Sequence, residues 1–166
     1  MIKYPSPSFE AKIITPDELL NKLQLSKIAH PVVFTNGCFD ILHRGHVTYL
    51  SQAKSLGTTL VVALNTDESV KRLGKGDERP MNSLVNRMAV VASLEMVDYV
   101  TYFNEDTPLG LIVQIRPDIL VKGGDWQVNN IVGSREVLAN NGHVYSIPFL
   151  YDTSTTDLIT KIRSGN

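Results

Sequence analysis

The sequence has very little cysteine and tryptophan, with one residue of each among its 166 positions. A single cysteine, Cys38, cannot form a disulfide bond within the chain, so we expect a protein that folds without covalent cross-links in a reducing compartment, the cytoplasm. A hydrophobic core can still form, because 166 residues bury enough apolar surface for one domain without a disulfide or a structural metal.

Long apolar runs and clusters of one charge are also absent. The longest apolar stretches, such as 60–64, are far too short to cross a bilayer, and the first residues lack the apolar segment of a signal peptide. The formal net charge is −1 and no block of consecutive basic residues occurs, whereas binding to nucleic acid or to an anionic membrane requires clustered Lys and Arg. We therefore expect neither nucleic acid nor membrane as a partner.

Strand-like and helix-like patterns alternate along the chain. Apolar runs predict strands at 31–36, 59–65, 99–103, 118–121 and 143–148. Periodicity and caps predict helices at 16–25, 45–56, 83–95 and 134–140, one that starts after Thr107 and Pro108, and one from about 154. The alternation predicts an α/β fold, a Rossmann-like doubly wound parallel sheet with helices on both faces. We expect a single domain over 31–166 after a helical lead-in over 1–30, with ligands bound beyond the carboxyl ends of the strands.

The sequence His43-Arg-Gly-His46 places two histidines around a glycine. This motif lies after the first predicted strand of the domain, at the start of a predicted helix. Gly45 has no side chain, so a phosphate can approach the backbone closely where free N–H groups and the helix dipole favour negative charge. The imidazole N–H groups of His43 and His46 add donors that can follow charge as it develops on a reacting phosphate. The motif therefore predicts a phosphate clamp, with a metal site as the alternative for this spacing.

The residues just before this motif are open to more than one interpretation. Asp40 is equally compatible with a carboxylate that holds the loop and with a direct nucleotide contact. Cys38 is more typical of a small packed residue than of a nucleophile, because no neighbour in the sequence would activate its thiol. Gly37 is typical of a turn at a strand end.

The second strand ends in Asn65-Thr-Asp67 and is followed by a basic, glycine-containing stretch from Lys71 to Pro80. Such a stretch is typical of a mobile loop over an anionic ligand, or of a solvated loop in which Lys71 and Lys75 only face water. Arg87 lies on the next predicted helix, either as a surface arginine or reaching back toward phosphates.

Two further strand ends carry residues suited to anions. In Lys122-Gly-Gly-Asp-Trp126, the paired glycines allow close backbone approach, Asp125 can accept from ribose hydroxyls, and Trp126 either covers a base or packs within the protein. Ser154-Thr-Thr156 supplies more hydroxyls than one N-cap needs, at a helix N-terminus suited to phosphate. Three such strand ends in one small domain favour a nucleoside triphosphate as ligand.

Together these motifs resemble the cytidylyltransferase-like nucleotidyltransferase superfamily, from Thr35-Asn-Gly-Cys-Phe-Asp40 and His43–His46 to Ser154-Thr-Thr156. Within it, the chain is most similar to the adenylyltransferases of ADP-heptose synthesis. The similarity extends over Arg79-Pro80, Arg87-Met88, Val97-Asp-Tyr99, Glu105-Asp-Thr-Pro108 and Val121-Lys-Gly-Gly-Asp-Trp126, although Trp126 stands where tyrosine is more usual. In many members of this group the domain follows a sugar-kinase domain in one chain. The sequence contains no kinase half, so we expect a stand-alone version that receives its sugar phosphate from a separate kinase.

The resemblance implies that AMP is transferred from ATP to D-glycero-β-D-manno-heptose 1-phosphate, giving pyrophosphate and ADP-heptose, a precursor of the lipopolysaccharide core. It implies Mg²⁺ bound with ATP, held mostly by phosphates and water, and a homo-oligomer, a dimer. The nearest alternative is a cytidylyltransferase acting on glycerol 3-phosphate or a similar alcohol phosphate. A non-catalytic nucleotide-binding module and a tRNA-handling domain are the alternatives from other classes.

The family pattern assigns roles to individual residues of this sequence. His43 and His46 are expected to be catalytic, and Lys71, Arg79 and Lys122 to bind the acceptor or the α-phosphate. No residue is expected to ligate a metal directly. The expected nucleotide-binding residues are Thr35, Asn36, Gly37, Cys38, Phe39, Asp40, His43, Gly45, His46, Asn65, Arg87, Gly124, Asp125, Ser154, Thr155 and Thr156.

Overall fold

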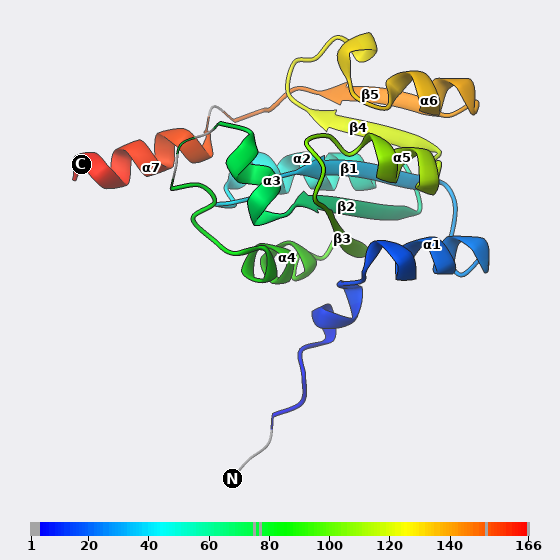
Figure 1. The fold of residues 1–166 in the computed structure, drawn as a ribbon, viewed down its shortest axis with the longest axis horizontal. Coiled ribbons are helices and arrows are strands. Elements are labelled where there is room, and N and C mark those ends of the chain that lie inside the picture. Colours follow the sequence, from blue (N-terminus) through cyan, green and yellow to red (C-terminus); the bar gives the residue numbers. More distant parts are fainter. Residues whose placement is uncertain (1–3, 75, 77, 152, 166) are drawn as a thin grey trace.

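A parallel five-stranded sheet forms the centre of the computed structural model, which describes residues 4–74, 76, 78–151 and 153–165 (Figure 1). Its strands are β1 (Val32–Gly37), β2 (Thr59–Asn65), β3 (Tyr99–Phe103), β4 (Ile119–Gly123) and β5 (His143–Ile147). They lie in the order β3-β2-β1-β4-β5, with all neighbours parallel. The direction of winding reverses between β1 and β4, where sheets of this kind bind ligands. The predicted doubly wound α/β fold is confirmed.

Helices cover both faces of the sheet. On one face lie α2 (Arg44–Lys54) and α4 (Leu84–Ala92), and on the other α1 (Pro16–Gln24), α5 (Leu109–Ile115) and α6 (Ser134–Ala139). Successive β1 residues alternate between the two layers, with Phe34 packed in the core beside α1 and Val33 in the core beside α2. Every residue of β2 is buried, which explains why its sequence is continuously apolar rather than alternating.

The N-terminal lead-in packs on this sheet. Thr15 caps α1 by accepting a hydrogen bond from the Glu18 backbone N–H, and the Glu18 carboxylate accepts one from the Thr15 N–H in return. Leu19 of α1 is fully buried in the same core as Ile14 and Ile28. Residues before 31 therefore contribute to the core, and the division of the chain at residue 30 stays a prediction.

The charged stretch after β2 differs from the expected loop. Its first two residues, Lys71 and Arg72, belong to α3 (Asp67–Arg72). The Thr66 hydroxyl caps this helix and accepts from the Ser69 backbone N–H. Six residues carry too little apolar periodicity to predict a helix, and the same holds for the 3₁₀ helices η1 (Ser8–Lys12) and η2 (Val128–Asn130). Lys71 is thus a helical residue, whereas Lys75 lies outside the described residues.

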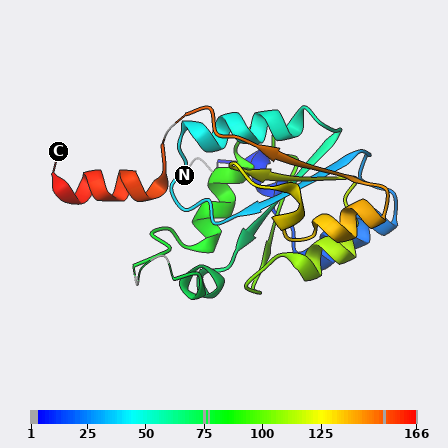
Figure 2. The ribbon, with the colours of Figure 1, turned by 90° about the horizontal axis from the view of Figure 1, so that it is seen from above.

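The last helix, α7 (Thr155–Ser164), extends away from the body of the molecule in both ribbon views (Figures 1 and 2). None of its residues is buried, and its contacts with the body include an ion pair between Arg163 and Glu78. Its N-terminus nevertheless lies against the loop after β1, where the Thr155 hydroxyl donates to the Ile41 carbonyl at 3.2 Å. No helix in the described ranges is long and apolar enough to span a bilayer.

Candidate active site

A cavity of about 820 Å³ lies beyond the carboxyl ends of β1 and β4, between the N-termini of α2 and α7. Its volume is within the range of about 300–1,000 Å³ that is usual for small-molecule sites. Its lining residues are Asn36, Gly37, Cys38, Phe39, Asp40, His43, His46, Tyr49, Arg79, Lys122, Gly123, Phe149, Leu150, Tyr151, Thr153, Ser154, Thr155 and Thr156.

His43 and His46 form a pair at the start of α2. His43 is the N-cap residue of this helix, and the two ring centroids are 3.8 Å apart, with Phe39 packed 5.3 Å from the His46 ring. The Nδ1 atom of each histidine is buried and has no hydrogen-bond partner among the described residues. Buried polar atoms are nearly always paired in native proteins, so two unpaired nitrogens on residues that line the cavity are unusual and are suited to a partner from water or a ligand.

Burial lowers the pKa of both imidazoles. It lowers the pKa of His43, and together with the neighbouring His43 it lowers the pKa of His46 to about 4. Both rings are therefore neutral at pH 7 in the ligand-free protein, where each carries one N–H. A polyphosphate in the cavity brings negative charge, which favours the protonated form and raises the pKa again. The pair is suited to gain positive charge when an anion binds.

The pKa of His46 predicts how the stability of the ligand-free protein depends on pH. Between pH 6.5 and about 4 the unfolded chain takes up a proton on His46 that the folded protein does not, so stability is complete above pH 6.5 and falls on acidification. The His46→Gln variant should lose less stability between pH 7.5 and 4.5, by on the order of 3 kcal/mol. Urea unfolding of both proteins at the two pH values measures the difference, and equal losses would contradict the assignment.

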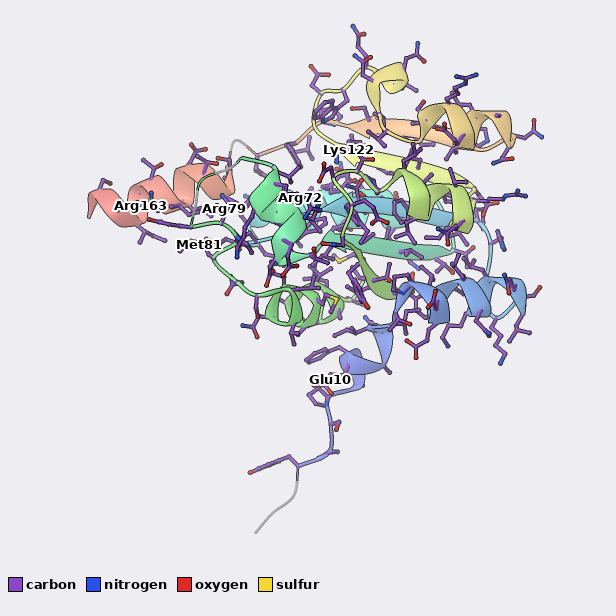
Figure 3. All side chains as sticks on the ribbon, viewed as in Figure 1. Glu10, Arg72, Arg79, Met81, Lys122 and Arg163 are labelled. Carbon is purple, nitrogen blue, oxygen red and sulfur yellow. The ribbon has the colours of Figure 1, made fainter. Side chains whose placement is uncertain are left out.

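Asp40 holds the segment after the charged stretch against the loop that follows β1. Its buried carboxylate accepts from Arg79 Nε at 2.5 Å and from the backbone N–H groups of Met81 at 3.0 Å and Asn82 at 2.9 Å (Figure 3 labels Arg79 and Met81). Both carboxylate oxygens are thus engaged by the protein. These contacts favour the loop-holding role, and because Asp40 also lines the cavity, the direct nucleotide contact stays a prediction.

Arg87 also differs from its expected roles. Its side chain is buried and donates to the carbonyls of Asn82, Cys38 and Asn65, and to Asp67 Oδ1 at 2.7 Å. It is neither a surface arginine nor part of the cavity wall. Instead it joins the ends of β1 and β2 to the start of α4, and thereby positions the loop after β1, which lines the cavity.

Thr35 acts behind the cavity rather than in its wall. It is fully buried, with Oγ1 2.5 Å from the hydroxyl oxygen of Tyr49, and Tyr49 in turn donates to the Val121 carbonyl at 3.2 Å. Burial raises the pKa of Tyr49, so its hydroxyl stays protonated. Tyr49 itself lines the cavity and was not predicted, because it lies within a helix and follows no strand end.

Most of the expected nucleotide-binding residues line the large cavity, and a few do not. Thr35, Gly45, Asn65, Arg87, Gly124 and Asp125 lie outside its wall, as does Lys71 among the expected acceptor ligands. The sequence prediction missed Tyr49, Gly123, Phe149, Leu150, Tyr151 and Thr153. Phe149, Leu150 and Tyr151 could have been found, because they follow β5 as the other site segments follow β1 and β4.

The start of α7 combines an N-cap with residues that line the large cavity. Ser154 caps the helix, since its hydroxyl oxygen accepts from the Asp157 backbone N–H at 3.1 Å and its O–H donates to the Asp157 carboxylate at 2.6 Å. The hydroxyl of Ser154 is therefore occupied, as the simple N-cap interpretation predicts. The first N–H groups of α7 and the helix dipole remain suited to a phosphate in the cavity.

A second cavity, of about 240 Å³, adjoins the first. Asn36, Gly37, Cys38 and Lys122 line both, and the smaller cavity extends toward the loops after β3 and β4. Its other lining residues are Asn65, Leu73, Asp106, Thr107, Pro108, Trp126, Asn130, Ile131 and Val132. Asn65 was expected in the nucleotide site and lines this cavity instead, with its amide nitrogen donating to the Ser69 hydroxyl at 2.9 Å.

Residues 34–161 match the model of the cytidylyltransferase-like family. The chain belongs to this family. It is 52% identical over 160 residues, covering 96% of this chain and 99% of the relative, to the D-beta-D-heptose 1-phosphate adenylyltransferase of Bordetella bronchiseptica. It is 55% identical over 152 residues to the bifunctional protein HldE of Actinobacillus succinogenes, a match that covers 91% of this chain but 32% of that protein.

Among solved structures, a lipopolysaccharide core biosynthesis protein from Thermoplasma volcanium is 28% identical with a TM-score of 0.59, over 73% of this chain and 98% of that chain. The predicted family is therefore confirmed. Within it, the site of this chain places two unpaired imidazole nitrogens, a helix N-terminus and the basic side chains of Arg79 and Lys122 around one cavity. This arrangement is suited to holding a polyphosphate and stabilising charge on it.

Proposed function

We propose that this protein transfers AMP from ATP to D-glycero-β-D-manno-heptose 1-phosphate and releases pyrophosphate. The observation that carries the proposal is the pair of buried, unpaired Nδ1 atoms of His43 and His46, in the same cavity wall as the N-terminus of α7. The acceptor is taken from the relative in Bordetella bronchiseptica, whose full length is matched at 52% identity and whose name states heptose 1-phosphate adenylyltransferase.

The reaction needs positioning and charge stabilisation more than a covalent intermediate. An oxygen of the acceptor 1-phosphate forms a bond to the α-phosphorus of ATP, while the bond from that phosphorus to the oxygen bridging to the β-phosphate breaks and pyrophosphate leaves with the electron pair. His43 and His46 donate to the triphosphate as negative charge develops, and the first turn of α7 holds the phosphates that leave. Imidazole rings that are neutral in the free protein and become protonated when ATP binds would stabilise the negative charge on the departing pyrophosphate.

Mg²⁺ is proposed to bind together with ATP. Among the described residues that line the cavity, Asp40 is the one with a carboxylate. Both of its oxygens already accept hydrogen bonds, from Arg79 and from backbone N–H groups. The described residues contain no cluster of three acidic, histidine or cysteine side chains that could hold an ion. The donor set therefore suits an ion held by phosphates and water, which would supply further neutralisation of the triphosphate charge.

A cytidylyltransferase acting on an alcohol phosphate is the second candidate, because it would use the same phosphate-binding groups. The base would contact the wall near Gly123, Phe149 and Leu150, where backbone groups would choose between adenine and cytosine.

The proposal also places the protein in the reducing cytoplasm as a homodimer. Size-exclusion chromatography with light scattering tests the dimer.

The substrate assignment is tested by crossing two nucleotides with two acceptors. We expect kcat/KM to be highest for ATP with D-glycero-β-D-manno-heptose 1-phosphate, compared with each pairing that includes CTP or glycerol 3-phosphate at one Mg²⁺ concentration. Buried polar groups that hydrogen bond several sugar hydroxyls reject an acceptor that lacks them, by factors that reach about 10⁴. If CTP with glycerol 3-phosphate gave the highest value, the heptose assignment would be wrong while nucleotidyl transfer stood. No pyrophosphate from any pairing would support the non-catalytic module.

A further inference from the structure

The smaller cavity shares one wall with the large cavity and has no assigned ligand. In-line displacement requires the attacking oxygen and the leaving pyrophosphate on opposite sides of the α-phosphorus. The large cavity holds the histidine pair and the start of α7, on the pyrophosphate side, and the smaller one opens from the shared wall of Asn36, Gly37 and Cys38 toward the loops after β3 and β4. Lys122 lines both cavities, so one cation can contact the α-phosphate and the acceptor phosphate. At about 240 Å³ the smaller cavity suits a ligand below drug size.

We propose that this cavity is the acceptor subsite, and that Trp126 and Asp106 determine which phosphorylated sugar it accepts. The proposal rests on the proposed function, because it requires a second substrate, but it does not depend on which sugar that substrate is. It assigns Trp126 to the acceptor rather than to the nucleotide base.

The loop after β4 holds Trp126 in a defined place. Its backbone N–H donates to the Ser146 hydroxyl at 2.9 Å, its indole N–H donates to the Gly123 carbonyl at 3.2 Å, and Ser146 donates to the Gly124 carbonyl at 2.6 Å. Gly124 has a φ of 117°, and a Cβ there would lie 2.8 Å from the indole nitrogen, so the indole can pack here only against a glycine. About half of the Trp126 surface stays exposed, which offers a rigid aromatic wall to the apolar C–H groups of a sugar ring.

The loop after β3 adds polar groups to the lining of the same cavity. Asp106 and Thr107 line the cavity there, and Asn130 adds an amide from η2. Arg72, at the end of α3, donates from Nε to Asp106 Oδ1 at 2.6 Å and also donates to the Asn104 carbonyl, so it fixes this loop. Figure 3 labels Arg72 and Lys122 at the same end of the sheet. The carboxylate of Asp106 is therefore oriented and can accept hydrogen bonds from sugar hydroxyls.

The single tryptophan makes the first test direct, because the intrinsic tryptophan fluorescence of this protein reports on Trp126 alone. The protein is titrated with D-glycero-β-D-manno-heptose 1-phosphate and with glycerol 3-phosphate, each with and without saturating α,β-methylene ATP. We expect the acceptor that supports turnover to change the fluorescence, and the nucleotide analogue alone to cause little change. A full change from the analogue alone, or no change from an acceptor that is turned over, would overturn the proposal.

Kinetics of two variants form the second test. Trp126→Ala and Asp106→Asn should each raise KM for the phosphorylated sugar by about tenfold or more, while KM for ATP stays within about twofold. Each substitution removes from the protein an aromatic packing surface or a charged carboxylate that contacts the sugar and not ATP. Trp126→Phe should retain most of the affinity. Tyr145→Ala and Glu105→Gln are matched controls outside both cavities, and should leave both KM values unchanged. An equal rise of KM for ATP would place these residues in the nucleotide site.

Failure of the proposed substrate is distinguishable from failure of this subsite. If glycerol 3-phosphate were the acceptor that is turned over, and it changed the Trp126 fluorescence, the subsite would stand and the heptose assignment would fall. If heptose 1-phosphate were turned over with unchanged fluorescence and with normal KM in the Trp126→Ala variant, the subsite would fall and the proposed function would stand.

Discussion

The His46→Ala variant is expected to turn over on the order of 10²–10³ times more slowly than the parent protein, which is the usual cost of removing one preorganised donor to developing charge. Its thermal stability should be nearly unchanged, because Nδ1 of His46 forms no hydrogen bond with the described residues and its ring is desolvated without compensation. The two effects are measured as kcat at saturating substrates and as the unfolding midpoint.

His143→Ala is the matched control for this experiment. His143 starts β5, is exposed, and lies outside both cavities, so its loss should change neither kcat nor the unfolding midpoint appreciably. Near-normal turnover of His46→Ala would remove His46 from the catalytic residues. A large fall in stability together with activity would instead indicate that His46 mainly supports the start of α2.

The Asp40→Ala variant should lose about 3–5 kcal/mol of unfolding free energy, because it leaves the buried guanidinium of Arg79 without its counter-charge. It also removes the acceptor for the backbone N–H groups of Met81 and Asn82. Urea unfolding at pH 7.5 measures the loss. Asp40→Asn should lose less, since an amide oxygen can still accept from one of these donors.

Asp17→Ala provides the comparison, because Asp17 is exposed at the start of α1 and its loss should cost below about 1 kcal/mol. Urea unfolding together with ATP binding of the Asp40 variants decides between the two roles that the sequence leaves open for Asp40. A variant with the stability of the parent but weak ATP binding would establish a direct nucleotide contact. A destabilised variant whose folded fraction binds ATP normally would establish the loop-holding role.

Much of the fold could be predicted from the sequence because its signals are local. The continuous apolar run of β2, the cap and first-turn proline of α1, and the glycine between His43 and His46 each lie within a few consecutive residues. The order of strands and helices follows from such segments, and the parallel sheet follows from their alternation. The cavity-lining segments after β1 and at the start of α7 were predicted on the same basis, since they follow strands and begin helices.

The hydrogen-bond partners of Asp40, Thr35 and Arg87 were decided only by the tertiary structure. Their partners lie far away in the sequence: Asp40 binds Arg79 and Arg87 binds the Cys38 carbonyl. A polar side chain near a motif can contact ligand or protein, and which it does depends on whether packing brings a buried donor or acceptor to it.

The second cavity also depends on distant segments, because its walls come from the ends of β1 and β2, from Leu73 after α3 and from the segments after β3 and β4. The sequence alone therefore determined the fold and the place of the His43–His46 motif at a strand end, through contiguous patterns of burial and capping. The tertiary structure decided which polar residues are left to meet a ligand, because that depends on the hydrogen bonds made between distant segments.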